Sequence, residues 1–226
     1  MKSRQCRASF APALVLLASG SFSGSLDGFA AQAQEIQGRE TAYRYEFEQP
    51  SFLVARMVVA LDAAGRGTLE YVEKDAPEPV RELVALRPES LARLRQLAVQ
   101  VAALSPEPPS ERHANLGLSK LTLVVSGKPV SVAFTYTQQP ALLELGRFFR
   151  GLVTQRQRVS QIEVARRYQP LDLPKLLRDL EADLVAQRIA EPAALGDLLG
   201  SLANDLRLSL IARNHARRLH ARVNGK

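Results

Sequence analysis

Hydrophobic and polar residues alternate along the first half of the chain in the manner of β-strands. Tyr43, Tyr45 and Phe47 alternate with charged residues, which is the period-two pattern of a half-buried strand. Four further segments are rich in valine or alternate in the same way: 52–61, 68–74, 121–125 and 130–136. Glycine-containing stretches at 62–67 and 126–129 predict hairpin turns, whereas Pro77 and Pro79 predict a loop.

Two helices are expected among these strands. Residues 88–104 place leucine, alanine and valine three or four positions apart, and the segment from Pro140 to Tyr168 repeats this spacing. Both segments begin with proline, which is favoured in the first turn of a helix because its missing N–H would have no partner there. Each strand pair is therefore followed by a helix.

The last third of the chain carries leucine stripes at helical spacing. One stripe lies within 173–184, directly after Asp172, which is a candidate N-cap. A second stripe runs over 195–210, after Pro192. Because such stripes usually face a core, we expect these leucines to be buried, Leu206 and Leu210 included.

Together these elements predict an α+β fold. We expect a four-stranded antiparallel sheet from two hairpin–helix units, followed by a C-terminal helical hairpin. The expected division is a cleaved signal peptide over 1–33, an α+β domain over 34–170 and a helical segment over 171–226 that packs on the preceding helix.

The N-terminal segment has the features of a secretory signal peptide. Basic residues precede an apolar run over 10–18, and Ala31-Gln32-Ala33 matches an A-x-A cleavage site. An uncleaved membrane anchor is the alternative, but the run is about half of the ~20 residues that a span needs. We therefore expect an exported protein, periplasmic or secreted, whose mature chain has no transmembrane segment and, with Cys6 removed, no cysteine.

The chain has a formal net charge of +7, and its basic residues are concentrated in the second half. Residues 34–140 hold 12 Lys or Arg and 13 Asp or Glu, whereas residues 141–226 hold 15 and nine. Two runs of arginine, separated by an acidic segment, are the candidate contact residues for an anionic partner: Arg147, Arg150, Arg156, Arg158, Arg166, Arg167, Arg213, Arg217, Arg218 and Arg222.

Two interpretations of these arginines remain open. In one, the acidic segment packs between the two runs, with Glu181 and Asp183 among the complementary charges. In the other, the surplus forms a basic helical face for an anionic partner. Export argues against nucleic acid, and residues 207–226 contain no Phe, Tyr or Trp for base stacking. The partner would then be an anionic lipid, lipopolysaccharide or an envelope protein.

The sequence lacks the motifs of common catalytic and cofactor sites. His215 and His220 are five residues apart, which turns their rings to different sides of a helix, and zinc-binding helices use a spacing of four. We therefore expect no metal, no cofactor and no catalytic residue, and solvated histidines. The leading hypothesis is a non-enzymatic cell-envelope interaction module. The alternatives are a hydrolase with a composite site, such as His113 with Glu70 or Glu73, and a structural subunit of an envelope complex.

Overall fold

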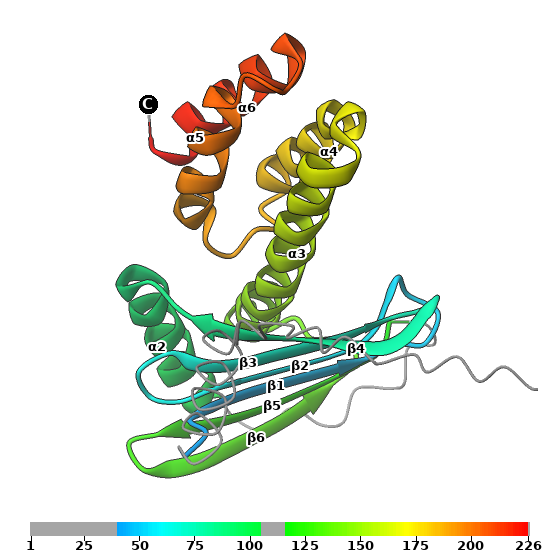
Figure 1. Ribbon diagram of the computed structural model, residues 1–226. Coiled ribbons are helices and arrows are strands. Elements are labelled where there is room, and N and C mark those ends of the chain that lie inside the picture. Colours follow the sequence, from blue (N-terminus) through cyan, green and yellow to red (C-terminus); the bar gives the residue numbers. More distant parts are fainter. Residues whose placement is uncertain (1–39, 105–115, 226) are drawn as a thin grey trace, which may run out of the picture.

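The computed structural model describes residues 40–104 and 116–225. The signal peptide expected over 1–33 and His113 lie outside the described residues, so the expectations about them stay predictions. A broad β-sheet forms the base of the molecule, and one long helix rises from it into a cluster of further helices (Figure 1). The α+β class expected from the sequence is confirmed.

The described residues form a sheet of six antiparallel strands rather than the four expected. The strands are β1 (Tyr43–Glu48), β2 (Val54–Leu61), β3 (Arg66–Glu73), β4 (Ala76–Ala85), β5 (Leu118–Val125) and β6 (Lys128–Phe134). They lie in the order β4-β3-β2-β1-β5-β6. The four-stranded prediction was wrong because β1 joins the two hairpins, pairing with both β2 and β5, and because β4 adds a strand at one edge.

Strand β4 replaces the loop that was expected at Pro77 and Pro79. It lies at the edge of the sheet and pairs with β3 alone. The outer side of an edge strand has no ladder to join, so a residue without an N–H is tolerated there. The pairing is also irregular between Tyr71 and Glu73, beside the proline-containing stretch. Proline thus marks a sheet edge in this chain, not a loop.

The two expected hairpin turns are confirmed. Ser126 and Gly127 connect β5 to β6 and both have positive φ, the conformation that a two-residue turn between twisted strands requires. In the β2–β3 turn, the Asp62 carboxylate accepts hydrogen bonds from the N–H groups of Ala64 and Arg66. Gly65 supplies the positive φ there, at 74°.

Five helices occur in the described part of the chain. They are α2 (Pro88–Ala102), α3 (Pro140–Tyr168), α4 (Leu173–Val185), α5 (Gly196–Asn204) and α6 (Leu210–Val223), with short 3-10 turns at Pro170–Asp172 and Pro192–Leu195. Figure 1 shows α2 and the first part of α3 on one face of the sheet, with α4, α5 and α6 farther away from it. Helix α3 therefore connects the two parts of the molecule.

The first core lies between the sheet and the helices that cover it. Tyr45, at the centre of β1, is fully buried, and its ring stacks on Phe149 of α3 with 5.2 Å between centroids. The Tyr45 hydroxyl lies 3.2 Å from Ser119 Oγ, so its burial leaves no polar group without a partner. Burial raises the pKa of Tyr45 above its ordinary value of 10.0, because a buried phenolate would lose its hydration.

The second core lies within the helical cluster. The last part of α3 contributes Ile162, and the other helices contribute residues such as Leu177, Leu199 and Leu219. The leucine stripe expected over 173–184 is confirmed, because its members are buried or packed against this core. Asp172 lies directly before α4 but makes no side-chain cap hydrogen bond, since its own backbone angles are already helical.

The prediction that the second leucine stripe is buried was wrong at the C-terminal end of the stripe. Leu206 and Leu210 are 81% and 61% exposed. The chain leaves the helix at Asp205 and starts a new one after Ser209, whose side chain caps α6 by accepting a hydrogen bond from Ala212 N–H. The break resets the helical period, so leucines that shared a face in one continuous helix do not share it here.

The C-terminal helical hairpin consists of α5 and α6 rather than of the two longer segments expected. Gly196 of α5 faces Asn224, the residue directly after α6, and Gly200 faces His220 of α6, one turn earlier. The helices are therefore antiparallel. An added Cβ on Gly200 would lie 3.3 Å from His220 Nε2, so the small residues allow this close approach.

A buried carboxylate connects the helical cluster to the sheet layer. Glu191 accepts a hydrogen bond from the N–H of Arg87, at the start of α2, over 2.8 Å. The N–H of Glu191 donates to Oε1 of Gln155 on α3 at 2.9 Å. Gly151 lets the same segment approach α3, since an added Cβ would lie 3.0 Å from the backbone nitrogen of Ala190. The segment before α5 is thus held both by the start of α2 and by α3.

Candidate functional site

The six arginines of the first predicted run lie on α3, and two of them form short ion pairs with the helical cluster. Arg158 Nε donates to Asp183 Oδ2 at 2.7 Å, and Arg166 Nη2 lies 2.8 Å from Asp205 Oδ2. Both carboxylates are nearly buried, with side chains 3% and 6% exposed. These two arginines therefore hold α3 against its neighbours and do not present a free charge.

The remaining arginines of α3 are spread along the helix. Each has a different neighbour: the Phe47 ring for Arg150, Glu82 for Arg156, the Tyr168 ring for Arg167, and a hollow beside Arg93 and Glu144 for Arg147. The structure consequently does not bring the six into one patch, and it separates Arg147 and Arg150 from the arginines of α6.

Acidic residues of α4 contact the elements on both sides of it. Asp183 accepts hydrogen bonds from Arg158 of α3 and from Arg188, which follows α4, both at 2.7 Å. Glu181 Oε2 lies 2.9 Å from His215 Nε2 of α6. This is the arrangement in which the acidic segment packs between its basic neighbours, and it applies to Arg158 but not to the arginines of α6.

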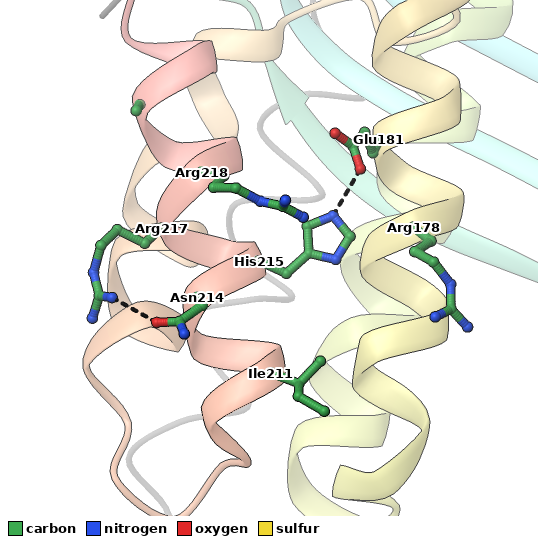
Figure 2. Close-up of a pocket in the computed structure, with 8 residues that line it drawn as sticks. Arg178, Glu181, Ile211, Asn214, His215, Arg217 and Arg218 are labelled. Carbon is green, nitrogen blue, oxygen red and sulfur yellow. Dashed lines mark hydrogen bonds and ion pairs between the residues drawn. The ribbon is translucent and has the colours of Figure 1, made fainter.

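The histidines differ from the solvated residues that were expected. His215 is buried, with 6% of its surface exposed, and lies between α4 and α6, where it meets Glu181 (Figure 2). His220 is partly buried over Gly200 and lies 3.1 Å from the side-chain amide of Asn224. Both rings therefore belong to helix–helix contacts.

The second predicted run lies on α6 and is largely exposed. Arg217, Arg218 and Arg222 all face solvent, and Arg217 Nη1 donates to Asn214 Oδ1 at 2.8 Å. Arg213 is partly buried, and its Nε is the buried side-chain polar atom without a hydrogen-bond partner among residues 40–104 and 116–225. Among the described residues, no recorded ion pair joins an arginine of α6 to a carboxylate, in contrast to Arg158 and Arg166 of α3.

A groove lies between α4 and α6 and has a volume of about 710 Å³. We call it the cationic groove; it is lined by Arg178, Glu181, Ile211, Asn214, His215, Arg217, Arg218 and Ala221. Figure 2 shows Arg178 on α4, with Arg217 and Arg218 on α6. Three arginines and one acid, Glu181, line the groove, so positive charge predominates in it.

Sequence reasoning missed Arg178 and Asn214 as members of this groove. Arg178 belongs to the acidic segment that was counted as a balancing block, and an uncharged Asn214 gave no charge signal. Because α4 and α6 are neighbours only after folding, the sequence spacing of 36 residues between Arg178 and Asn214 carries no hint of the contact. The signal that the sequence did offer was Arg178 itself, a basic residue within a predominantly acidic segment.

The described residues do not test the composite hydrolase site, which requires His113. Glu70 Oε2 is paired with Arg81 Nε at 2.7 Å across β3 and β4, whereas Glu73 Oε1 accepts from Gln157 Nε2 on α3 at 2.7 Å. The two glutamates thus serve different neighbours, and His113 lies outside the described residues. Within the same described ranges, no group of three or more His, Cys, Asp or Glu is placed to hold a metal ion.

The geometry defines an α+β protein with a cationic groove in a C-terminal helical cluster. The chain matches no protein-family model, no curated protein and no solved structure. In the ranges 40–104 and 116–225, no helix is both long and apolar enough to cross a membrane. Function has therefore to be inferred from the groove and its surroundings.

The Asp205 carboxylate gives a pH-dependent contribution to stability. Hydrogen bonds from Arg207 and Arg166 hold the pKa of Asp205 far below its ordinary value of 3.8. A carboxylate whose pKa is lowered by folding stabilises the folded state at every pH above its ordinary pKa. This contribution fades as the pH falls toward the pKa of the folded state. We expect Asp205→Asn to lower the urea midpoint at pH 7, and the difference from wild type to shrink below about pH 4. Asp172→Asn, which alters an exposed carboxylate, is the control; an Asp205→Asn effect as large at pH 3 as at pH 7 would contradict the assignment.

Proposed function

We propose that the protein is an exported, non-enzymatic interaction module of the cell envelope that binds an anionic partner through the cationic groove and the adjoining arginines of α6. The observation that carries this proposal is the contrast between the two arginine runs. Arg158 and Arg166 are engaged in ion pairs with nearly buried carboxylates, whereas Arg217, Arg218 and Arg222 remain at the surface.

The shape and charge of the groove support an anion as the ligand. Arginines line both walls of the groove, Arg178 on α4 and Arg218 on α6. In Figure 2, Arg218 extends toward His215, whereas the guanidinium of Arg178 lies on the side of α4 away from α6. Arg side chains suit phosphate and carboxylate because their N–H donors form a planar fork. The His215–Glu181 contact across the groove connects the two walls. An anion in the groove therefore meets arginines from two helices that are already held against each other.

The expectation that the protein is exported rests on the sequence alone. The basic n-region, short apolar run and A-x-A site predict delivery out of the cytoplasm. The partners available there include anionic lipid, lipopolysaccharide and acidic envelope proteins. All of them are negatively charged, as polyphosphate is. Mass spectrometry of the native protein tests this part, since an N-terminus at Gln34 is the expected result.

Binding to fluorescein-labelled inorganic polyphosphate, followed by anisotropy, tests the groove directly. We expect binding that weakens as NaCl rises from about 50 to about 300 mM, because screening shortens the reach of exposed charges. The variant Arg217→Ala/Arg218→Ala/Arg222→Ala should bind about tenfold more weakly, given the contribution of about 0–1 kcal/mol that each exposed pair makes.

A matched variant separates groove binding from general charge. Lys74→Ala/Lys120→Ala/Lys128→Ala removes the same number of positive charges from exposed positions on the sheet, and we expect its affinity to stay within about twofold of wild type. Polyphosphate that does not bind, binding that ignores salt, or an equal loss in both variants would each refute the proposed function.

A further inference from the structure

Large apolar side chains are exposed at the end of the helical cluster that points away from the sheet. Among the described residues, seven large hydrophobic side chains are more than 60% exposed, and five of them lie in two neighbouring turns. We call these five the apolar tip: Tyr168, Leu171, Leu206, Leu210 and Ile211, with exposures of 70, 88, 81, 61 and 71%. Exposed apolar groups gathered at one place mark an interaction surface.

The two turns that carry the apolar tip are joined by an ion pair. Tyr168 and Leu171 lie where α3 passes into α4, and the other members lie between α5 and the first turn of α6. Arg166, at the end of α3, binds Asp205 at 2.8 Å and Ser201 Oγ at 2.9 Å, both near the end of α5. Figure 1 shows both turns at the end of the molecule opposite the sheet.

The exposure of Leu206 and Leu210 is built into the α5–α6 turn. Leu208, between them, is buried in the helical core and its N–H donates to the carbonyl of Asp205 at 3.1 Å. Ser209 then caps α6. With Leu208 anchored inward and both turn ends fixed, the two flanking leucines are held outward by the backbone.

Cations surround the apolar tip. Arg167, Lys175 and Arg207 are exposed beside its two turns. Ile211 lines the cationic groove together with Arg178, so the tip and the groove form one continuous surface. Acids of this surface include Glu181, which lines the groove, and Asp205, which is already shared by two arginines.

We propose that the apolar tip inserts into the headgroup region of an anionic lipid bilayer while the arginines of the cationic groove contact lipid phosphates. This inference rests on the proposed function and names its partner. Apolar side chains beside Lys and Arg are what interfacial binding requires, because apolar burial and attraction to anionic lipid act together. Two projecting turns suit a soft lipid surface better than a protein partner, since a specific protein interface buries about 800 Å² on each side.

Co-sedimentation with vesicles of phosphatidylglycerol and phosphatidylcholine tests the insertion. We expect salt-sensitive binding that grows with the phosphatidylglycerol fraction. The tip variant Leu171→Ser/Leu206→Ser/Leu210→Ser should bind about 100-fold more weakly, because three apolar side chains lose most of their burial in lipid. The control Leu53→Ser/Val99→Ser/Val185→Ser alters comparably exposed apolar residues elsewhere and should bind within about twofold of wild type.

A spectroscopic readout places the tip in the lipid. The chain contains no tryptophan, so Tyr168→Trp supplies a single reporter whose emission should shift to the blue on vesicles and be quenched by brominated lipid. Tyr136→Trp, after β6 on the sheet, should show neither change. Circular dichroism and urea midpoints equal to wild type establish that each variant is folded.

The two proposals fail in different ways. The tip variant alters no residue that lines the cationic groove, so its binding to polyphosphate should equal that of wild type. If polyphosphate binds but the tip variant and wild type bind vesicles alike, or the emission of the Tyr168→Trp variant does not move, insertion is refuted and the anion-binding groove stands. If the tip variant instead dissolves a dimer seen by sedimentation velocity, with no vesicle binding, the tip serves a second copy and insertion is again refuted.

Discussion

Replacement of Phe149 by alanine should lower the free energy of unfolding by about 3–5 kcal/mol, the range measured for truncating a large buried aromatic side chain. Phe149 is fully buried. Its ring stacks on Tyr45 with an interplanar angle of 4° and meets Phe148 edge-on at 5.7 Å. It is the contact at which α3 is attached to the central strand, so its removal loosens the sheet from the helix that leads into the helical cluster.

The expected loss is large compared with the stability of an ordinary domain, which is about 5–15 kcal/mol. Urea unfolding followed by circular dichroism measures it, and tyrosine fluorescence reports on the sheet because Tyr45 and Tyr71 are buried there. The control is Leu53→Ala, an apolar side chain 69% exposed beside β2, which should change the free energy of unfolding by no more than about 0.5 kcal/mol. A Phe149→Ala change below about 1 kcal/mol would mean that the ring stack contributes little.

Local sequence patterns predicted where the strands and helices lie better than they predicted which strands pair with one another. The alternation of Tyr43, Tyr45 and Phe47 identified β1 correctly, since one face of the strand is buried. It could not show that β1 lies between β2 and β5, because β5 is distant along the chain and its pairing is decided by the packed core. A strand count made from consecutive hairpins therefore fell short.

The loop predicted from two prolines and the buried stripe predicted from two leucines were wrong for the same physical reason. Pro77 and Pro79 are incompatible with a central strand but not with an edge, and edge position is a property of the whole sheet. Leu206 and Leu210 fit a helical stripe until the chain turns at Asp205, where a carboxylate held by Arg166 and Arg207 fixes a break. In both cases the outcome depends on tertiary structure: on which strands border β4 in the sheet, and on the contact of Arg166 with Asp205.

The candidate site shows the same limit for charge. The sequence identified Arg158 and Arg218 alike as contact residues, because it counts charges without their neighbours. The fold places a nearly buried carboxylate against Arg158 and leaves Arg218 beside the groove. Whether an arginine stabilises the fold or remains available to a ligand is therefore set by tertiary placement, and this distinction separates α3 from α6.

The Asp183 carboxylate is the clearest test of that distinction. It is 2% exposed and accepts hydrogen bonds from Arg158 and Arg188, both at 2.7 Å. Its replacement by alanine removes two charge-assisted hydrogen bonds, each contributing about 1.5–3 kcal/mol. The two arginines are 26% and 58% exposed and can regain water, so we expect a net loss of about 2–3 kcal/mol in the free energy of unfolding, below the range for stranding a buried charge.

The consequence for binding should be the opposite of that for stability. Asp183→Ala frees Arg158 and Arg188 from their shared acid, so the folded variant should bind polyphosphate at least as tightly as wild type, since positive charge has become available near the helical cluster. Urea unfolding and anisotropy on the same preparation measure both quantities. Glu163→Ala, which removes an exposed acid of α3, should leave stability within about 0.5 kcal/mol while raising the net charge equally. If Asp183→Ala weakened polyphosphate binding while staying folded, Asp183 would be supporting the cationic groove, and the separation of structural from ligand-binding arginines would be wrong.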